Sequence, residues 1–296
     1  MSVAILLAGC GGGSSPRSRP SLSPYEPPAV SSSAGSPSGL LPIQQYMLLG
    51  RDYDVVMRAV VVLAQQCMDK QGFKVTLPPP VPARGAISDL SYGRYGLDSL
   101  AEAEGYGYGF APEHRPRPDP AGEEFERSIT ATERSALVGA DLAEMDARYR
   151  NGCVGQADQR LMAGTSAIWA DGIQASPLVR QVNLDPRAKD SPATESSMKN
   201  FAGCMAAAGY PDTPDPREPP PQFRRSSPAS EATAAEKRAA VTQFKCQQSS
   251  GVSAAMRSAE IAFQLKAIDA NPEAFAQIKS DIQAVVRRAT TIVGDR

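Results

Sequence analysis

Residues 67–73, CMDKQGF, and residues 204–210, CMAAAGY, share the pattern C-M-x-x-x-G-aromatic. Each copy ends a run whose apolar residues recur at alternating spacings of three and four, which indicates one face of an α-helix. In each copy the glycine lies where a helix C-terminus favours a left-handed residue, and the following aromatic residue can pack back on the last turn. The chain is therefore predicted to contain two copies of a cysteine-bearing helix end.

A second cysteine follows each copy of this repeat, and together they suggest a disulfide framework. Four cysteines allow three pairings, and the repeat favours one bridge per copy, Cys67–Cys153 and Cys204–Cys246. Bridges that close loops of tens of residues contribute about 4 kcal/mol each on the chain-entropy account. The sequence has no C-x-x-C, and its single histidine, His114, lies in a proline-rich stretch. We therefore expect no metal site and no cofactor.

The N-terminus carries a motif that predicts a location. Leu7-Ala8-Gly9-Cys10 follows a short apolar run and resembles a bacterial lipobox, in which the cysteine is lipidated and becomes the first residue. Residues 11–39 form a Gly/Ser/Pro tract typical of a flexible tether. We therefore expect a signal peptide over 1–9, lipidation at Cys10 and a disordered tether within 10–42. This places the protein on the outer face of the cytoplasmic membrane.

The lipobox has one competing interpretation. The segment before Cys10 has no Lys or Arg, and its apolar run is shorter than the roughly 7–15 residues of a secretory signal. A start site further upstream would explain this deficit. The alternative is a cytosolic protein in which the motif is accidental. No later segment approaches the ~18 consecutive apolar residues that span a bilayer, so membrane attachment would rest on the lipid alone.

Helical periodicity extends well beyond the repeat. A first helical segment over 45–72 is stopped by the proline-rich stretch 77–82, because proline lacks the backbone donor that a helix needs. A loop-rich region follows, with one short helix expected over 98–104. Periodicity returns over 131–175, where Trp169 is expected in the core. This part of the chain is predicted to be helices separated by long Pro/Gly-rich loops.

The C-terminal part has the clearest helical pattern. It begins near Ser230 and restarts at Asn271-Pro272, where the asparagine can cap the first turn and the proline suits the first helical position. Long helices with apolar faces pack on one another. We therefore expect an all-α, disulfide-stapled domain over 43–296, built from two loosely repeated cysteine-containing halves. These halves are residues 43–176 and 190–296.

Further motifs support a family resemblance. They are Arg94-Tyr95-Gly96-Leu97, Gly105-Tyr106-Gly107-Tyr108, Ser135-Ala136-Leu137-Val138-Gly139 before Gly152-Cys153, and Lys245-Cys246 in a helix running on to Ala270-Asn271-Pro272. With the two cysteine repeats, the chain resembles a family of uncharacterised lipoproteins and secreted proteins of actinobacteria. The resemblance implies an envelope-associated helical protein and supplies no catalytic residues. The chain departs from the family in its weak basic region before Cys10 and its Pro/Ser-rich stretch after Gly209.

Composition and charge limit the function classes. The 296 residues carry 31 Lys and Arg against 32 Asp and Glu, a formal net charge of -1. Such a balance gives no long-range field for nucleic acid, so we expect no nucleic-acid partner. Because the chain has a single histidine, most catalytic mechanisms that rely on histidine acid–base chemistry or on a catalytic triad are excluded. The remaining enzymatic alternative is a secreted cell-wall hydrolase that uses carboxylates within 98–124, with candidates Asp98, Glu104, Glu113 and Glu123.

Aromatic residues interleaved with glycines form the best candidate contact surface. They are Tyr92, Tyr95, Tyr106, Tyr108 and Phe110. Such rings can stack on sugars or anchor a partner protein, and the alternative is that they pack as a lid over the helices. The favoured function is a non-enzymatic, lipid-anchored envelope protein that binds or scaffolds. Its expected partners are the membrane, through the N-terminal lipid, and an envelope protein or glycan.

Overall fold

The computed structural model describes residues 40–81, 92–115, 119–139, 152–165, 176–224 and 231–294. Within these ranges the chain forms ten α-helices and no strands, so the predicted all-α fold is confirmed. The predicted signal peptide over 1–9, the predicted lipidation site Cys10 and the predicted tether up to residue 39 lie outside the described residues, as does Trp169. Among the helices described, none combines the length and apolar character needed to cross a membrane.

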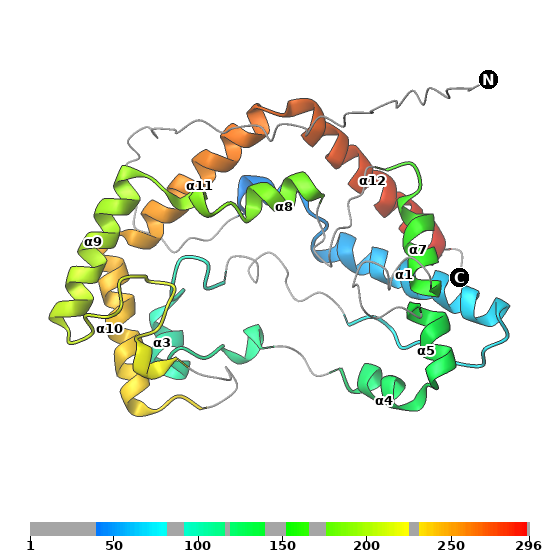
Figure 1. Ribbon diagram of the computed structural model, residues 1–296, viewed down its shortest axis with the longest axis horizontal. Helices are drawn as coiled ribbons and strands as arrows, with labels where there is room; N and C mark the ends of the chain where they lie inside the picture. The colour runs from blue at the N-terminus through cyan, green and yellow to red at the C-terminus, as the bar shows by residue number, and fades with distance from the viewer. Residues whose placement is uncertain are drawn as a thin grey trace, which may run out of the picture.

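The helices form an arch with two ends joined by a long span (Figure 1). Two helices run along the span, and a group of helices gathers at each end. The α-helices are α1 (Gly50–Lys70), α3 (Leu100–Tyr106), α4 (Pro120–Ser128), α5 (Ala131–Val138), α7 (Cys153–Met162), α8 (Pro177–Asn183), α9 (Pro192–Ala207), α10 (Ala234–Ser250), α11 (Val252–Asp269) and α12 (Pro272–Gly294). The 3-10 turns are η1 (Pro42–Tyr46), η2 (Pro112–His114), η3 (Pro186–Lys189) and η4 (Pro221–Phe223). Helices α11 and α12 form the span; α3, α9 and α10 form one end, and α1, α4, α5 and α7 the other.

Both cysteine repeats end their helices in the same way. Gly72 and Gly209 have positive φ angles of 86° and 89°. The amide of Phe73 donates to the Met68 carbonyl at 3.1 Å, and that of Tyr210 donates to the Met205 carbonyl at 2.9 Å. This bond joins residues five positions apart, closes a Schellman motif and satisfies a carbonyl that the helix end leaves free. The glycine supplies the left-handed backbone that the motif requires, as predicted.

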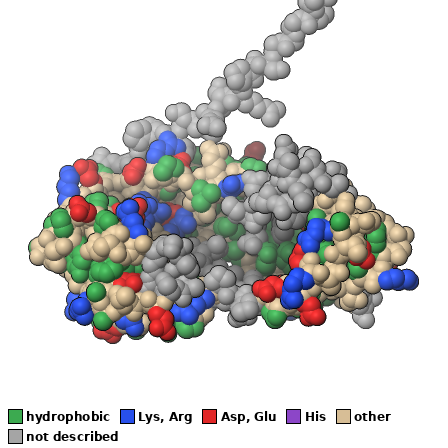
Figure 2. All heavy atoms as spheres, turned by 60° about the horizontal axis from the view of Figure 1, so that its bottom comes forward, with side chains coloured by type: hydrophobic (Ala, Val, Ile, Leu, Met, Phe, Trp, Pro, Cys, Tyr) green, Lys and Arg blue, Asp and Glu red, His purple; other side chains and the backbone are tan. Residues whose placement is uncertain are grey.

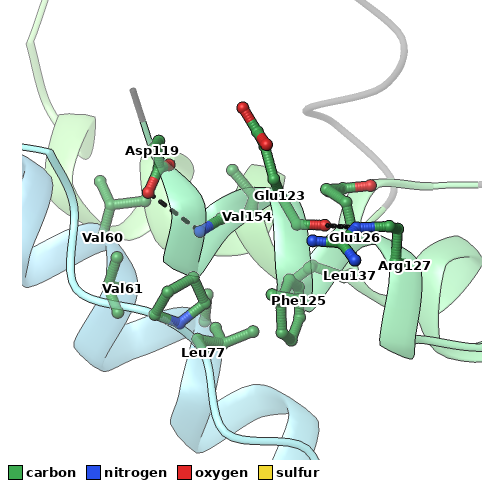
Figure 3. A pocket seen from close by; sticks show the side chains of 13 residues that line it. Val60, Val61, Leu77, Asp119, Glu123, Phe125, Glu126, Arg127, Leu137 and Val154 are labelled. Atoms are coloured by element: carbon green, nitrogen blue, oxygen red, sulfur yellow. Dashed lines mark hydrogen bonds between the residues drawn. The ribbon is translucent and has the colours of Figure 1, made fainter. Parts of the chain in front are cut away.

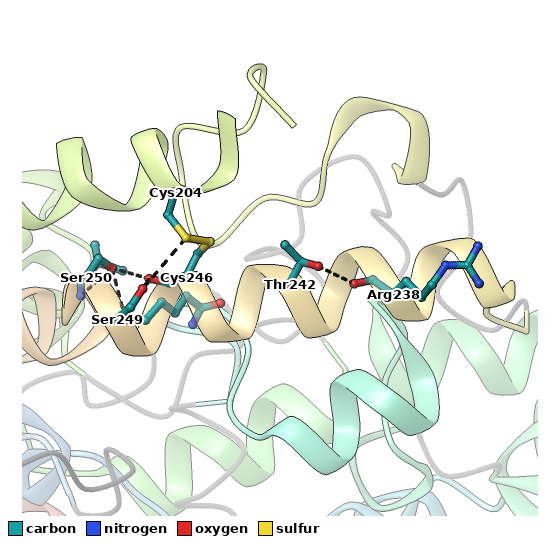
Figure 4. Close-up of a disulfide and its surroundings, with 8 residues drawn as sticks. Cys204, Arg238, Thr242, Cys246, Ser249 and Ser250 are labelled. Carbon is teal, nitrogen blue, oxygen red and sulfur yellow. Dashed lines mark hydrogen bonds between the residues drawn. A yellow bond between two sulfur atoms is a disulfide. The ribbon is translucent and has the colours of Figure 1, made fainter. Parts of the chain in front are cut away.

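Both predicted disulfides are present. Cys67 near the end of α1 is bonded to Cys153 at the start of α7, with their Cα atoms 5.5 Å apart. Cys204 in α9 is bonded to Cys246 in α10, with their Cα atoms 5.7 Å apart (Figure 4). The methionine after the first cysteine of each repeat is fully buried beside its bridge. Each end of the arch is therefore closed by one bridge and a small apolar cluster.

The main core lies where α12 packs on α1. Val56 and Val60 of α1, Phe275 and Val285 of α12, and Ile43 of η1 belong to one buried cluster. At the other end of the arch, α3 packs on α10. Elements from 43–176 and from 190–296 therefore combine at both ends of the arch, because the C-terminal helix returns to the first helix.

Candidate functional site

The candidate contact surface is built on residues 92–115. A turn at Tyr92–Gly96 leads into α3, which begins after the cap Ser99, whose Oγ accepts the Glu102 amide at 3.1 Å. The buried Ala103 of α3 packs against Phe244 of α10. A short helix packed on a long one gives the aromatic side chains around it a fixed support.

Two of the five predicted aromatic residues point into the protein. Tyr95 is 3% exposed, and its hydroxyl donates to Glu260 Oε2 at 2.8 Å. The Tyr108 hydroxyl donates to Gln243 Oε1 at 2.9 Å, and the ring packs in the cluster between α3 and α10. These two residues pack against the helices and do not belong to an exposed surface.

The other three lie in two neighbouring groups, one with the single histidine and one with Arg115. The ring of Tyr92 stacks on His114 with centroids 3.8 Å apart and meets Phe110 edge to face at 5.8 Å. The guanidinium of Arg115 lies 5.8 Å from the centre of the Tyr106 ring, and its Nε donates to the Phe110 carbonyl at 2.9 Å. Phe110 is 36% exposed, a large value for a phenylalanine. We call Tyr92, Tyr106, Phe110, His114 and Arg115 the aromatic surface.

Two carboxylates lie beside this surface. Asp98 accepts the Gly93 amide at 2.7 Å, and burial raises the pKa of Asp98, helped by the nearby Glu102 and opposed by that amide and by His114. Burial, followed by a hydrogen bond with Glu102, raises the pKa of Tyr92. The structure thus places the histidine in a partly buried turn, stacked on Tyr92 and near Asp98. Glu102 is not among the residues predicted from the sequence, although it lies three residues after the helix cap Ser99, a spacing typical of a helix start.

The other candidate carboxylates are not brought together. Glu104 is exposed on α3, whereas Glu123 lies on α4 at the opposite end of the arch (Figure 1). The side chain of Glu113 lies outside what the structure describes. Asp98 and Glu123 therefore cannot act as the acid and base of one site in this arrangement.

An apolar cleft of about 680 Å³ lies at the α4 end of the arch. Val60, Leu77, Phe125, Leu137 and Val154 are among the apolar residues that line it. Figure 3 shows the Glu123 carboxylate directed away from these side chains, and Asp119 bonded to the amide of Gly122, the third residue of α4. The cleft therefore offers apolar contact without a convergent set of polar groups.

No metal centre is evident in the described ranges, where no group of three or more His, Cys, Asp and Glu residues could hold an ion. No family model, no curated protein and no solved structure matches the chain. The structure thus defines a class by architecture alone: an all-α protein with two disulfides and an exposed aromatic surface around one histidine.

Proposed function

We propose that the protein is a lipid-anchored cell-envelope protein that binds a partner protein non-enzymatically through the aromatic surface. Two disulfides support an oxidising compartment outside the cytoplasm, since such bridges are rare in reducing compartments. The lipobox-like Leu7–Cys10 and the Gly/Ser/Pro tract after it support attachment by a lipid and a tether. The helical arch would then be held close to the membrane.

The observation that carries the binding role is the exposed phenylalanine within a supported ring cluster. Aromatic residues and arginine are enriched among the residues that dominate protein interfaces, because they bury large areas at low entropic cost. Phe110 and Arg115 are joined by a hydrogen bond, and the Tyr92 ring meets Phe110 edge to face and stacks on His114. The surface is therefore ordered before any partner binds, which lowers the entropic cost of association.

The same contacts favour a protein over a glycan. Sugars bind to open ring faces, yet His114 covers one face of Tyr92, and the Arg115 guanidinium lies over Tyr106. The surface instead presents ring edges, the Phe110 ring and a guanidinium. These groups fit a protein partner with an apolar pocket and acidic side chains around it.

A matched pair of alanine variants tests this role. The variant Phe110→Ala removes the most exposed ring, and Leu265→Ala removes a 46% exposed leucine on α11 as a control. We expect Phe110→Ala to lower the affinity for one defined envelope protein about tenfold, since an anchor residue contributes about 1.4 kcal/mol or more to the binding free energy. Capture should be unchanged with the control. Equal capture by both variants, or binding only to purified wall glycan, would contradict a protein-binding role.

A secreted hydrolase is the second candidate, and one observation favours it. The single histidine lies beside Asp98, whose pKa burial raises, and Tyr92 bonds to Glu102. Such a cluster contains groups that can donate and accept protons. Incubation with isolated wall polymers should give no turnover if the role is binding. Turnover that disappears in both Asp98→Asn and His114→Gln, with folding retained, would establish the enzyme instead.

A further inference from the structure

A second cluster of charges lies under the turn that precedes α3. Its centre is Glu260 of α11, whose side chain is fully buried. Arg94 Nε donates to both carboxylate oxygens at 3.1 and 3.0 Å, and Arg94 Nη2 also contacts Oε1. The Tyr95 hydroxyl donates at 2.8 Å and Gln264 Nε2 at 3.1 Å. A carboxylate has about four acceptor positions, so that of Glu260 is already saturated.

Arg94 also holds a second element through its Nη2. Its Nη2 donates to the backbone carbonyl of Asn183 at 2.8 Å and to the Asn183 side-chain oxygen at 3.1 Å. Gln264 in turn accepts the amide of Ile43 at 3.1 Å. The network thus ties η1, the end of α8 and the turn at 92–96 to α11. Arg94 and Glu260 therefore have a structural role here.

Lys189, the last residue of η3, is the member of the cluster that lacks hydrogen-bond partners. Its Nζ lies 3.8 Å from Glu260 Oε2, beyond the usual hydrogen-bond range, and 5.8 Å from the centre of the Tyr95 ring. Among the described residues, none accepts a hydrogen bond from this ammonium. The side chain is only 20% exposed, so it also has limited access to water. Lys189 therefore has up to three donors to offer at a partly buried position.

The charge around Lys189 is not balanced. Arg94, Lys189 and Arg217 face the two carboxylates of Glu260 and Asp215, which leaves one positive charge. Arg217 is paired with Asp215 through bonds of 2.8 and 2.5 Å, and its side chain is 44% exposed. Burial lowers the pKa of Lys189; Glu260 and Asp215 oppose this, while Arg94 and Arg217 add to it. Figure 2 shows the molecule hollowed between the two ends of the arch, with Lys and Arg side chains in the recess.

We propose that Lys189, with Arg217 near it, binds a phosphate group of a soluble ligand at this partly buried position. Lysine binds phosphate as a compact point charge, and phosphate has enough acceptor oxygens for three ammonium donors. A group with a charge near -2 would more than neutralise the one uncompensated positive charge. The site is separate from the aromatic surface and does not depend on the proposed partner protein.

Titration with inorganic phosphate tests the site. We would measure binding by calorimetry for the full chain and for Lys189→Gln, Lys189→Arg and Lys199→Gln. Lys199 is a control, since it lies 74% exposed on α9 in a pair with Glu195. We expect Lys189→Gln to weaken binding about tenfold, Lys189→Arg to retain most of it, and the control to match the wild type. Thermal unfolding of each variant checks that it is folded.

Two outcomes would overturn the proposal. One is the absence of phosphate binding by the wild type, and the other is equal binding by Lys189→Gln and the wild type. A parallel assay with phosphatidylglycerol vesicles separates the sources of phosphate. Binding to vesicles that needs Lys189, without binding of inorganic phosphate, would contradict a soluble ligand and indicate a lipid headgroup.

Discussion

The buried pair of Arg94 and Glu260 provides the sharpest test of the fold. Substituting Arg94→Met would leave the fully buried carboxylate with only Tyr95, Gln264 and the more distant Lys189. Breaking one side of a buried ion pair costs about 3–5 kcal/mol, because a charge stays buried without its partner. Since three donors or cations remain nearby, we expect a loss of about 3 kcal/mol in the free energy of unfolding.

The double variant Arg94→Met/Glu260→Gln separates this pair from general damage. Removing both charges leaves no uncompensated carboxylate, and a glutamine can still accept from Tyr95. We therefore expect the double variant to be at least as stable as Arg94→Met, with a coupling of about 2 kcal/mol. Urea unfolding, followed by circular dichroism, measures the wild type, Arg94→Met, Glu260→Gln and the double variant under the same conditions.

The stability that the Arg94–Glu260 pair provides should depend on pH. Burial alone would raise the pKa of Glu260, but Arg94, Lys189 and Tyr95 hold it below its ordinary value of 4.5. The stability from this group is therefore present above 4.5 and is lost as the pH falls through the lowered folded value. Without Arg94 the carboxylate accepts a proton more readily, so the deficit of Arg94→Met should shrink between about pH 7 and about pH 4. A deficit below about 1 kcal/mol at pH 7, or one equal at both pH values, would refute the reasoning.

Three further changes have defined outcomes. Burial raises the pKa of Asp158 to about 6, so its ionisation lowers the stability of the fold as the pH rises from about 4 to about 6. In urea unfolding, Asp158→Asn should therefore raise the free energy of unfolding by about 2 kcal/mol at pH 7 and by almost nothing below about pH 4. Replacing Cys204 and Cys246 together by serine opens a bridge with a sequence separation of 42, and should cost about 4 kcal/mol by the same assay; an unchanged midpoint would contradict this. A Cβ at Gly96, where φ is 118°, would lie 2.5 Å from Gln247 Nε2, so Gly96→Ala should lower the melting temperature markedly. The control is Gly105→Ala, where a Cβ meets no neighbouring atom and the substitution should act only through helix propensity.

Local features of the fold could be predicted from the sequence. The Schellman motifs at Gly72 and Gly209 involve residues close together in the chain, so a seven-residue sequence pattern is enough to predict them. The disulfides followed from the repeat, and α12 begins at Pro272, as the Asn-Pro pair predicted. These features depend on backbone geometry that neighbouring residues determine.

The long-range arrangement could not be predicted. Arg94 and Glu260 are separated by 166 positions, and nothing local distinguishes this pair from other charged residues. The ring of His114 stacks on that of Tyr92, which lies before α3 in the chain, and helical periodicity does not specify such a contact between two turn residues. For the same reason the five aromatic residues looked equivalent, although Tyr95 and Tyr108 face the helices and Phe110 faces outward.

A non-reducing intact mass and peptide map of the protein, purified from the envelope fraction of cells that express it, tests the central proposal most directly. We predict a mature protein that begins at a diacylated Cys10, with Cys67 linked to Cys153 and Cys204 linked to Cys246. A chain that begins at Met1 and carries all five cysteines as free thiols would contradict the envelope location and the bridges on which the fold depends.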